Sequence, residues 1–99
     1  MGIVEEYIPK ENYALISLNN GYLTKNDDII IMGKNTDTYL HQKAKQINYD
    51  GKLVEKTPHG TAKYKVNIKL RVDGEVIGNG EDTIYIFTDK TYKSKKYSL

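Results

Sequence analysis

The chain contains no cysteine among its 99 residues, and this absence excludes several kinds of chemistry at once. Disulfide bonds, zinc sites built from thiolates and thiol nucleophiles all require cysteine. Because small secreted domains often depend on disulfides, a chain of this size without them is expected in the cytoplasm. Long apolar runs are also missing: none approaches the roughly 20 residues that cross a membrane, so no membrane association is predicted.

Aromatic residues other than tyrosine are scarce, since the chain has nine Tyr, one Phe and no Trp. Tyrosine suits a thin sheet, because its ring can pack while its hydroxyl reaches water. The length predicts one domain that buries roughly 60–65% of its unfolded surface. This allows one compact core but no deep substrate cavity.

The charge is unevenly distributed, although the net formal charge is only +2. The last twelve residues, TDKTYKSKKYSL, hold four lysines against one aspartate, and the rest of the chain is nearly neutral. We therefore predict a single domain at residues 1–87, followed by a basic tail at residues 88–99.

Short runs that alternate apolar and polar residues between turn-forming residues predict an all-β fold. Strands are expected at residues 3–8, 13–18, 28–32, 38–50, 64–72 and 82–87. A brief return strand at residues 75–77 follows the turn pair Asp73-Gly74. These roughly six or seven strands and their turns fit a small β-barrel or a sandwich.

The segment at residues 38–50 admits two interpretations. Leu40, Ala44 and Ile47 have helical spacing, so a helix is possible. However, the segment is rich in poor helix formers and lacks an N-terminal capping box. We favour a long strand with a bulge near Ala44.

Three stretches carry a resemblance to a known family. They are Val4-Glu5-Glu6-Tyr7 with Pro9-Lys10, Thr36-Asp37 with Gln46-Ile47, and the longer pattern Ala14-x-Ile16-x-Leu18-x-x-Gly21-x-Leu23-x-x-x-Asp27-x-Ile29-x-Ile31-x-Gly33. Together they resemble the β-barrel second domain of translational GTPases such as elongation factor Tu. The resemblance implies a small six- to seven-stranded Greek-key β-barrel. They look most similar to small archaeal translation elongation factor-like proteins made of that barrel alone. A related barrel occurs at the C-terminus of some collagenase-like peptidases.

Catalytic patterns are missing from the sequence. Gly33-Lys34-Asn35-Thr36 lacks the first glycine and the Ser or Thr of a phosphate-binding loop. His41 and His59 lack metal-ligand spacing, and the neighbouring Asp27 and Asp28 would point to opposite faces of a strand. We therefore predict no enzyme activity, no metal and no cofactor.

Basic residues on the predicted strands are the feature that points to a function. Those at residues 64–72 would project from one face, opposite Tyr64, Val66, Ile68, Leu70 and Val72. Cations interleaved with tyrosines can bind a nucleic-acid backbone and stack on bases. The predicted nucleic-acid-binding residues are Lys43, Lys45, Lys63, Lys65, Lys69 and Arg71.

The resemblance implies the same kind of partner, because this barrel in elongation factors contacts aminoacyl-tRNA and ribosomal RNA. We therefore expect a non-catalytic RNA- or ribosome-associated binding module with tRNA or ribosomal RNA as partner. The alternative is a protein-interaction module with a protein partner, acting as an accessory subunit or as a homodimer through an exposed strand edge.

Overall fold

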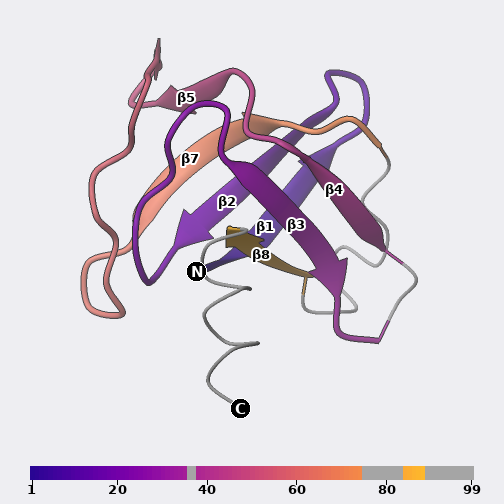
Figure 1. The fold of residues 1–99 in the computed structure, drawn as a ribbon, viewed down its shortest axis with the longest axis horizontal. Coiled ribbons are helices and arrows are strands. Elements are labelled where there is room, and N and C mark those ends of the chain that lie inside the picture. The colour runs from indigo at the N-terminus through magenta and orange to yellow at the C-terminus, as the bar shows by residue number, and fades with distance from the viewer. Residues whose placement is uncertain (36–37, 75–83, 89–99) are drawn as a thin grey trace.

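A computed structural model describes residues 1–35, 38–74 and 84–88, which form one antiparallel sheet that curves into a half-barrel (Figure 1). Over these residues the sheet has eight strands in the order β4-β3-β8-β1-β2-β7-β5-β6. The strands are β1 (Gly2–Ile8), β2 (Tyr13–Leu18), β3 (Asp28–Gly33), β4 (Tyr39–Lys43), β5 (Ile47–Tyr49), β6 (Lys52–Leu53), β7 (Val66–Arg71) and β8 (Ile84–Thr88). The described residues contain no helix, and therefore none that could cross a membrane. The all-β prediction is confirmed.

The hydrophobic core lies on the inner face of the half-barrel and follows the two-residue alternation of the strands. Along β7, Val66, Ile68 and Leu70 are buried, whereas Asn67 is exposed and Lys69 is half-buried. Alternation places successive side chains on opposite faces, so one strand supplies both a core face and an outer face. The largest buried core side chains are Ile16, Leu18, Leu23, Ile29, Ile31, Ile47, Leu70, Val72, Ile84 and Ile86.

The segment at residues 38–50 forms two strands, and its helical interpretation is wrong. β4 and β5 are separated at residues 44–46, where a bulge was predicted. Ala44 is fully buried, and Gln46 has a positive φ of 49°. β4 pairs with β3 at one edge of the sheet, and β5 pairs with β7 near the other edge. The segment therefore connects the two ends of the strand order.

A buried glutamine links β4 to the end of β7. The Gln42 Nε2 group donates a hydrogen bond of 2.9 Å to the Arg71 carbonyl oxygen. The Asp73 N–H donates one of 2.7 Å to Gln42 Oε1. These bonds satisfy backbone groups that no strand pairs with, so the side chain takes the place of a ladder between β4 and β7.

Two loops are hydrogen-bonded to each other near the start of β7, at the opposite end of this strand from the Gln42 link. Gly21 and Gly60 exchange backbone hydrogen bonds of 3.0 and 2.8 Å. The Leu23 N–H also donates to Thr57 Oγ1 at 2.9 Å, and the Thr57 N–H donates to the Leu23 carbonyl oxygen at 2.9 Å. The loop that precedes β3 and the loop that precedes β7 therefore form one hydrogen-bonded unit.

Several strand boundaries differ from the prediction by one or two residues. β7 begins at Val66, so Tyr64 lies before it and is 70% exposed instead of joining the core face. The last predicted strand is observed as β8, which includes Thr88. The predicted return strand at residues 75–77 and the tail beyond Thr88 lie outside the described residues.

Candidate functional site

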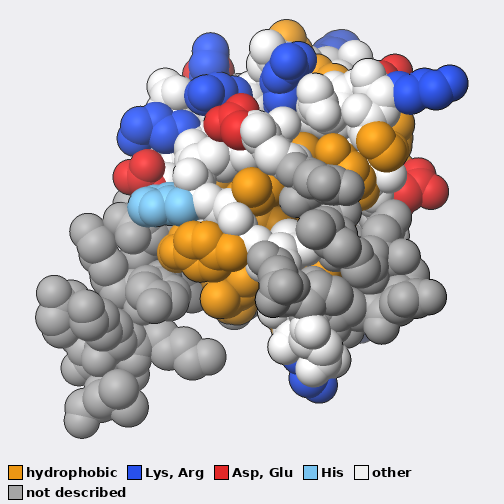
Figure 2. Space-filling model, turned by 90° about the vertical axis from the view of Figure 1, so that its right-hand side faces the viewer, with side chains coloured by type: hydrophobic (Ala, Val, Ile, Leu, Met, Phe, Trp, Pro, Cys, Tyr) orange, Lys and Arg blue, Asp and Glu red, His pale blue; other side chains and the backbone are white. Residues whose placement is uncertain are grey.

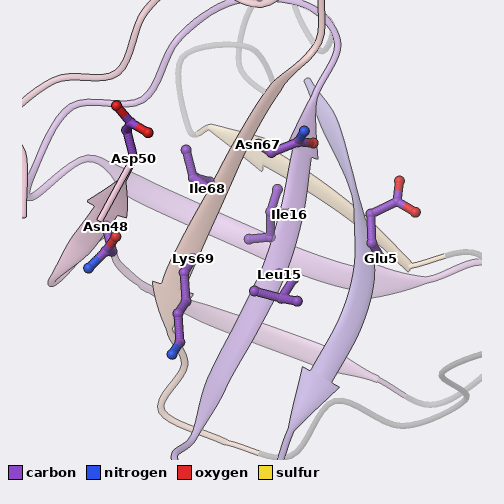
Figure 3. Close-up of a pocket in the computed structure, with 8 residues that line it drawn as sticks. All are labelled: Glu5, Leu15, Ile16, Asn48, Asp50, Asn67, Ile68 and Lys69. Carbon is purple, nitrogen blue, oxygen red and sulfur yellow. The ribbon is translucent and has the colours of Figure 1, made fainter. Parts of the chain in front are cut away.

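A groove of about 350 Å³ crosses the outer face of β1, β2, β7 and β5 (Figure 3). Its side chains come from four strands that are neighbours in the sheet; β1 and β2 are consecutive in the sequence, whereas β5 and β7 lie further along the chain. The lining residues are Glu5, Leu15, Ile16, Asn48, Asp50, Asn67, Ile68 and Lys69. Ile16 and Ile68 belong to the core, so the outward-facing members of this set define the chemistry of the groove.

A row of four paired residues runs across the strands, and three of them, Leu15, Lys69 and Asn48, line the groove. Glu6 pairs with Leu15, Leu15 pairs with Lys69, and Lys69 pairs with Asn48. Directly paired residues share a face of the sheet, so all four lie on the outer side. Leu15 is half-buried there and supplies an apolar floor between polar neighbours.

Carboxylates stand at the two ends of the groove. Glu5 comes from β1, and Asp50 follows β5 directly. Neither carboxylate forms a hydrogen bond or an ion pair with any other residue that the structure describes. The ends of the groove therefore carry negative charge that is available to a ligand.

Lys69 contributes little free positive charge to the groove. Its Nζ atom lies 3.1 Å from Glu11 Oε2 and 4.7 Å from the centroid of the Tyr13 ring. Figure 3 shows its side chain directed away from Asp50. The ion pair and the cation–π contact hold this ammonium group away from the Asp50 end of the groove.

The Lys69–Glu11 pair is expected to contribute little to stability. A double-mutant cycle with Lys69→Met and Glu11→Gln should give a coupling free energy below about 1 kcal/mol, because both side chains are partly exposed. Urea unfolding at low and high salt measures it, and the coupling should shrink as salt rises. A coupling that is large and independent of salt would contradict this assignment.

Two amide side chains face the groove from adjacent strands. Asn48 lies on β5 and Asn67 lies on β7. An Asn side chain has two N–H donors and a carbonyl acceptor, which match the acceptor and donor of a peptide unit. Neither side-chain amide is engaged by another described residue, so both can bind a ligand.

The six predicted nucleic-acid-binding residues do not form one stripe. Lys63 and Lys65 precede β7, and Lys45 follows β4. Three of the cations are paired with carboxylates: Lys43 with Asp28 at 3.0 Å, Lys45 with Asp73 at 3.5 Å and Lys69 with Glu11 at 3.1 Å.

The remaining three predicted residues have no carboxylate partner among the described residues. Lys63 lies 5.4 Å from the ring centroid of its neighbour Tyr64, and Lys65 and Arg71 are exposed. Figure 2 shows basic side chains gathered at the top of one face with acidic side chains among them. Interleaved charges weaken the field that a polyanion would meet, and a binding role for these six residues stays a prediction.

Sequence reasoning did not identify the groove residues other than Lys69. One signal was present in Ile3-Val4-Glu5-Glu6, where two apolar residues and then two acidic residues break the alternation of a regular strand. Such a break is typical of a bulge. The positions of Asn48, Asp50 and Asn67 in one groove depend on the pairing of β5 with β7, which no local pattern shows.

Comparison with known proteins gives a fold relationship and no family. No protein-family model matches the chain, and no curated protein matches it. A solved structure does: the C-terminal domain of a Geobacillus thermoleovorans protein described as a U32 peptidase, at a TM-score of 0.69 and 16% identity over 89% of each chain. The fold is therefore similar to that of a peptidase C-terminal domain.

A second solved structure, the selenomethionine variant of the same domain, also matches. Its TM-score is 0.65 at 16% identity, and the match covers 86% of this chain and 93% of that one. At this identity the likeness concerns the fold alone.

These neighbours correct the family expected from the sequence. The identification as a translation elongation factor-like protein is wrong, because the structural neighbours are peptidase C-terminal domains and not elongation factor domains. The expectation of an RNA- or ribosome-associated module that resembles this elongation factor domain is wrong for the same reason. The motif that misled consists of turn glycines and core aliphatic residues, which small β-barrels of different function can share.

The alternative of an exposed strand edge has no better support. β6, at one edge of the sheet, is only two residues long. A short edge offers few backbone groups to an added strand.

Proposed function

We propose that this chain is a non-catalytic domain that holds an extended polypeptide in the groove across β1, β2, β7 and β5. The observation that carries this proposal is the groove itself, with an apolar floor at Leu15, and with amides on Asn48 and Asn67 and carboxylates at both ends that no residue in the described part of the chain engages. The similarity to the C-terminal domain of a peptidase supports a polypeptide as the class of ligand.

The chemistry of the groove suits a chain in extended conformation. Leu15 can pack against one aliphatic side chain, with the modest gain that a partly buried contact provides. Asn48 and Asn67 can bond to the peptide units on either side of that residue. A shallow groove with these groups fits binding better than it fits enclosure of a small substrate.

The carboxylates are spaced for binding and not for shared acid–base chemistry. β1, β2, β7 and β5 are consecutive in the sheet, so Glu5 and Asp50 are separated by three strand spacings, roughly 14 Å. General acid–base catalysis needs groups within hydrogen-bonding reach of the same reacting atoms. This separation supports a domain without catalytic activity of its own.

Two finer expectations belong to the proposal. One is a closed Greek-key barrel, supported by the segment at residues 39–49, whose two strands pair toward opposite ends of the sheet. The other is a cytoplasmic location, supported by the absence of cysteine.

Leu15→Lys is expected to lower the affinity of the domain for unstructured polypeptide by about tenfold or more, because it replaces the apolar floor with a charged group. Fluorescence anisotropy with a labelled pool of leucine-containing, unstructured peptides measures the affinity. Circular dichroism checks that the variant is folded, which is expected because lysine can extend into solvent at this half-buried position.

The matched control is Tyr39→Lys, which introduces the same charge on β4 at a residue that is 58% exposed and outside the groove. This control should bind like the unmodified domain. Absence of binding by the unmodified domain, or equal binding by Leu15→Lys, would refute the proposed function.

A further inference from the structure

Both end carboxylates of the groove are positioned by irregular backbone. The pairing of β1 with β2 shifts register between Val4 and Glu6, so Glu5 is the extra residue of a β-bulge. Asp50 has a positive φ of 54°, a conformation that is unfavourable for residues other than glycine and is tolerated best by Asn and Asp. A bulge re-aims the side chains around it, so each end of the groove has a local feature that places a carboxylate there.

The free charge of the groove is negative. Glu5 and Asp50 are exposed, and neither has a salt-bridge partner among the described residues. Lys69, the one lysine among the described lining residues, is paired with Glu11. Charge complementarity therefore favours a ligand with positive groups at both ends.

The spacing of the strands matches the repeat of an extended chain. Three strand spacings amount to roughly 14 Å, and a chain with a rise of about 3.3 Å per residue covers this span in about four residues. Residues i, i+2 and i+4 of an extended chain lie on the same face. Leu15 on β2 lies between Glu5 on β1 and Asp50 beyond β5, one strand spacing from β1 and two from β5, within reach of the side chain of residue i+2.

We infer that the groove binds an extended polypeptide segment that crosses the strands and carries Lys or Arg at positions i and i+4 around an aliphatic residue at i+2. The inference rests on the proposed function and names the class of sequence that the groove selects. The two cations contact Glu5 and Asp50, and the aliphatic side chain packs on Leu15. Asn48 and Asn67 bond to the backbone between them.

The positive charge of Lys65 opposes the binding of a ligand cation at the Asp50 end of the groove. It lines a smaller hollow that adjoins the groove and shares Asp50 and Asn67 with it. Its ammonium group forms no ion pair with a described residue, so it competes with the ligand cation for the field of Asp50. Removing this charge should tighten binding of a basic segment.

Three labelled peptides test the inference by fluorescence anisotropy. They are Ser-Lys-Ser-Leu-Ser-Lys-Ser, the same peptide with Glu in place of both Lys, and a peptide of the same composition with its two Lys adjacent. The unmodified domain should bind the first peptide about tenfold more tightly than the acidic one, with the third between them. The preference should weaken as salt is added.

The double variant Glu5→Gln with Asp50→Asn should lose the preference for the basic peptide. Both changes keep the shape of the side chain, and asparagine tolerates the positive φ of Asp50, so the variant should remain folded. Glu55→Gln, an exposed acidic residue outside the groove, is the matched control and should keep the preference. Lys65→Ala should bind the basic peptide more tightly than the unmodified domain does.

The outcomes separate this inference from the proposed function. Equal binding of all three peptides, with loss of binding in Leu15→Lys, would overturn the sequence preference and leave a polypeptide-binding groove. Binding of none of them, together with none of the leucine-containing pool, would overturn both. A preference that survives Glu5→Gln with Asp50→Asn would show that other groups select the charge and would also overturn the inference.

Discussion

Gly60→Ala is expected to destabilise the folded domain by roughly 3 kcal/mol or more. A Cβ atom at this position would lie much closer to the Leu18 carbonyl oxygen than the sum of the two van der Waals radii allows. Neither partner can move freely, because Leu18 is fully buried at the end of β2 and Gly60 exchanges two hydrogen bonds with Gly21. Relief of the clash must therefore break the Gly21–Gly60 link or displace β2.

Urea unfolding followed by circular dichroism measures this effect, and Gly74→Ala is the matched control. At Gly74 the nearest atom to an added Cβ is a terminal methyl of Leu40, the far end of a flexible side chain. Because Leu40 can change rotamer, the control should lose clearly less stability than Gly60→Ala. Equal losses in the two variants would show that the backbone around Gly60 can relax.

Gln42→Ala is expected to lower the free energy of unfolding by about 2–3 kcal/mol. The substitution removes the three hydrogen bonds of the Gln42 side chain, and it leaves the Arg71 carbonyl and the Asp73 N–H without these partners. Gln42 is only 8% exposed, so water cannot fully replace the lost side chain. The cost therefore includes unsatisfied polar groups as well as the lost bonds.

Gln42→Glu tests the donor and acceptor roles of this side chain separately. A carboxylate still accepts a hydrogen bond from the Asp73 N–H, but it cannot donate one to the Arg71 carbonyl. This variant should also be destabilised. Gln46→Ala is the control, since Gln46 makes a single exposed bond of 2.9 Å with the Tyr13 hydroxyl. A loss below about 0.5 kcal/mol is expected there. If Gln42→Ala were as mild as the control, the link between β4 and β7 would have no energetic importance.

The importance of Gly60 and Gln42 could not be recognised from the sequence. The turn Asn19-Asn20-Gly21 is a recognisable local signal, but nothing near Gly60 shows that Leu18 will press against it. Gln42 is an ordinary polar residue in an ambiguous segment. Its importance comes from partners 29 and 31 positions away along the chain.

The candidate site shows the same division. Lys69 was identified because a basic residue on an alternating strand must point outward. Its pairing with Glu11, 58 positions away, could not be inferred from that pattern. Glu5, Leu15 and Asp50 form a groove only because β1, β2, β7 and β5 become neighbours in the sheet.

The fold class, most strand positions and the break near Ala44 could be predicted from the sequence, because they depend on two-residue alternation and on turn residues within a short window. β2, for example, lies at the predicted residues 13–18. The order of the strands, the pairing of the cations and the position of the groove became visible only in the folded chain. These depend on pairing between distant segments, and a one-residue change of register would turn each outward side chain of a strand inward.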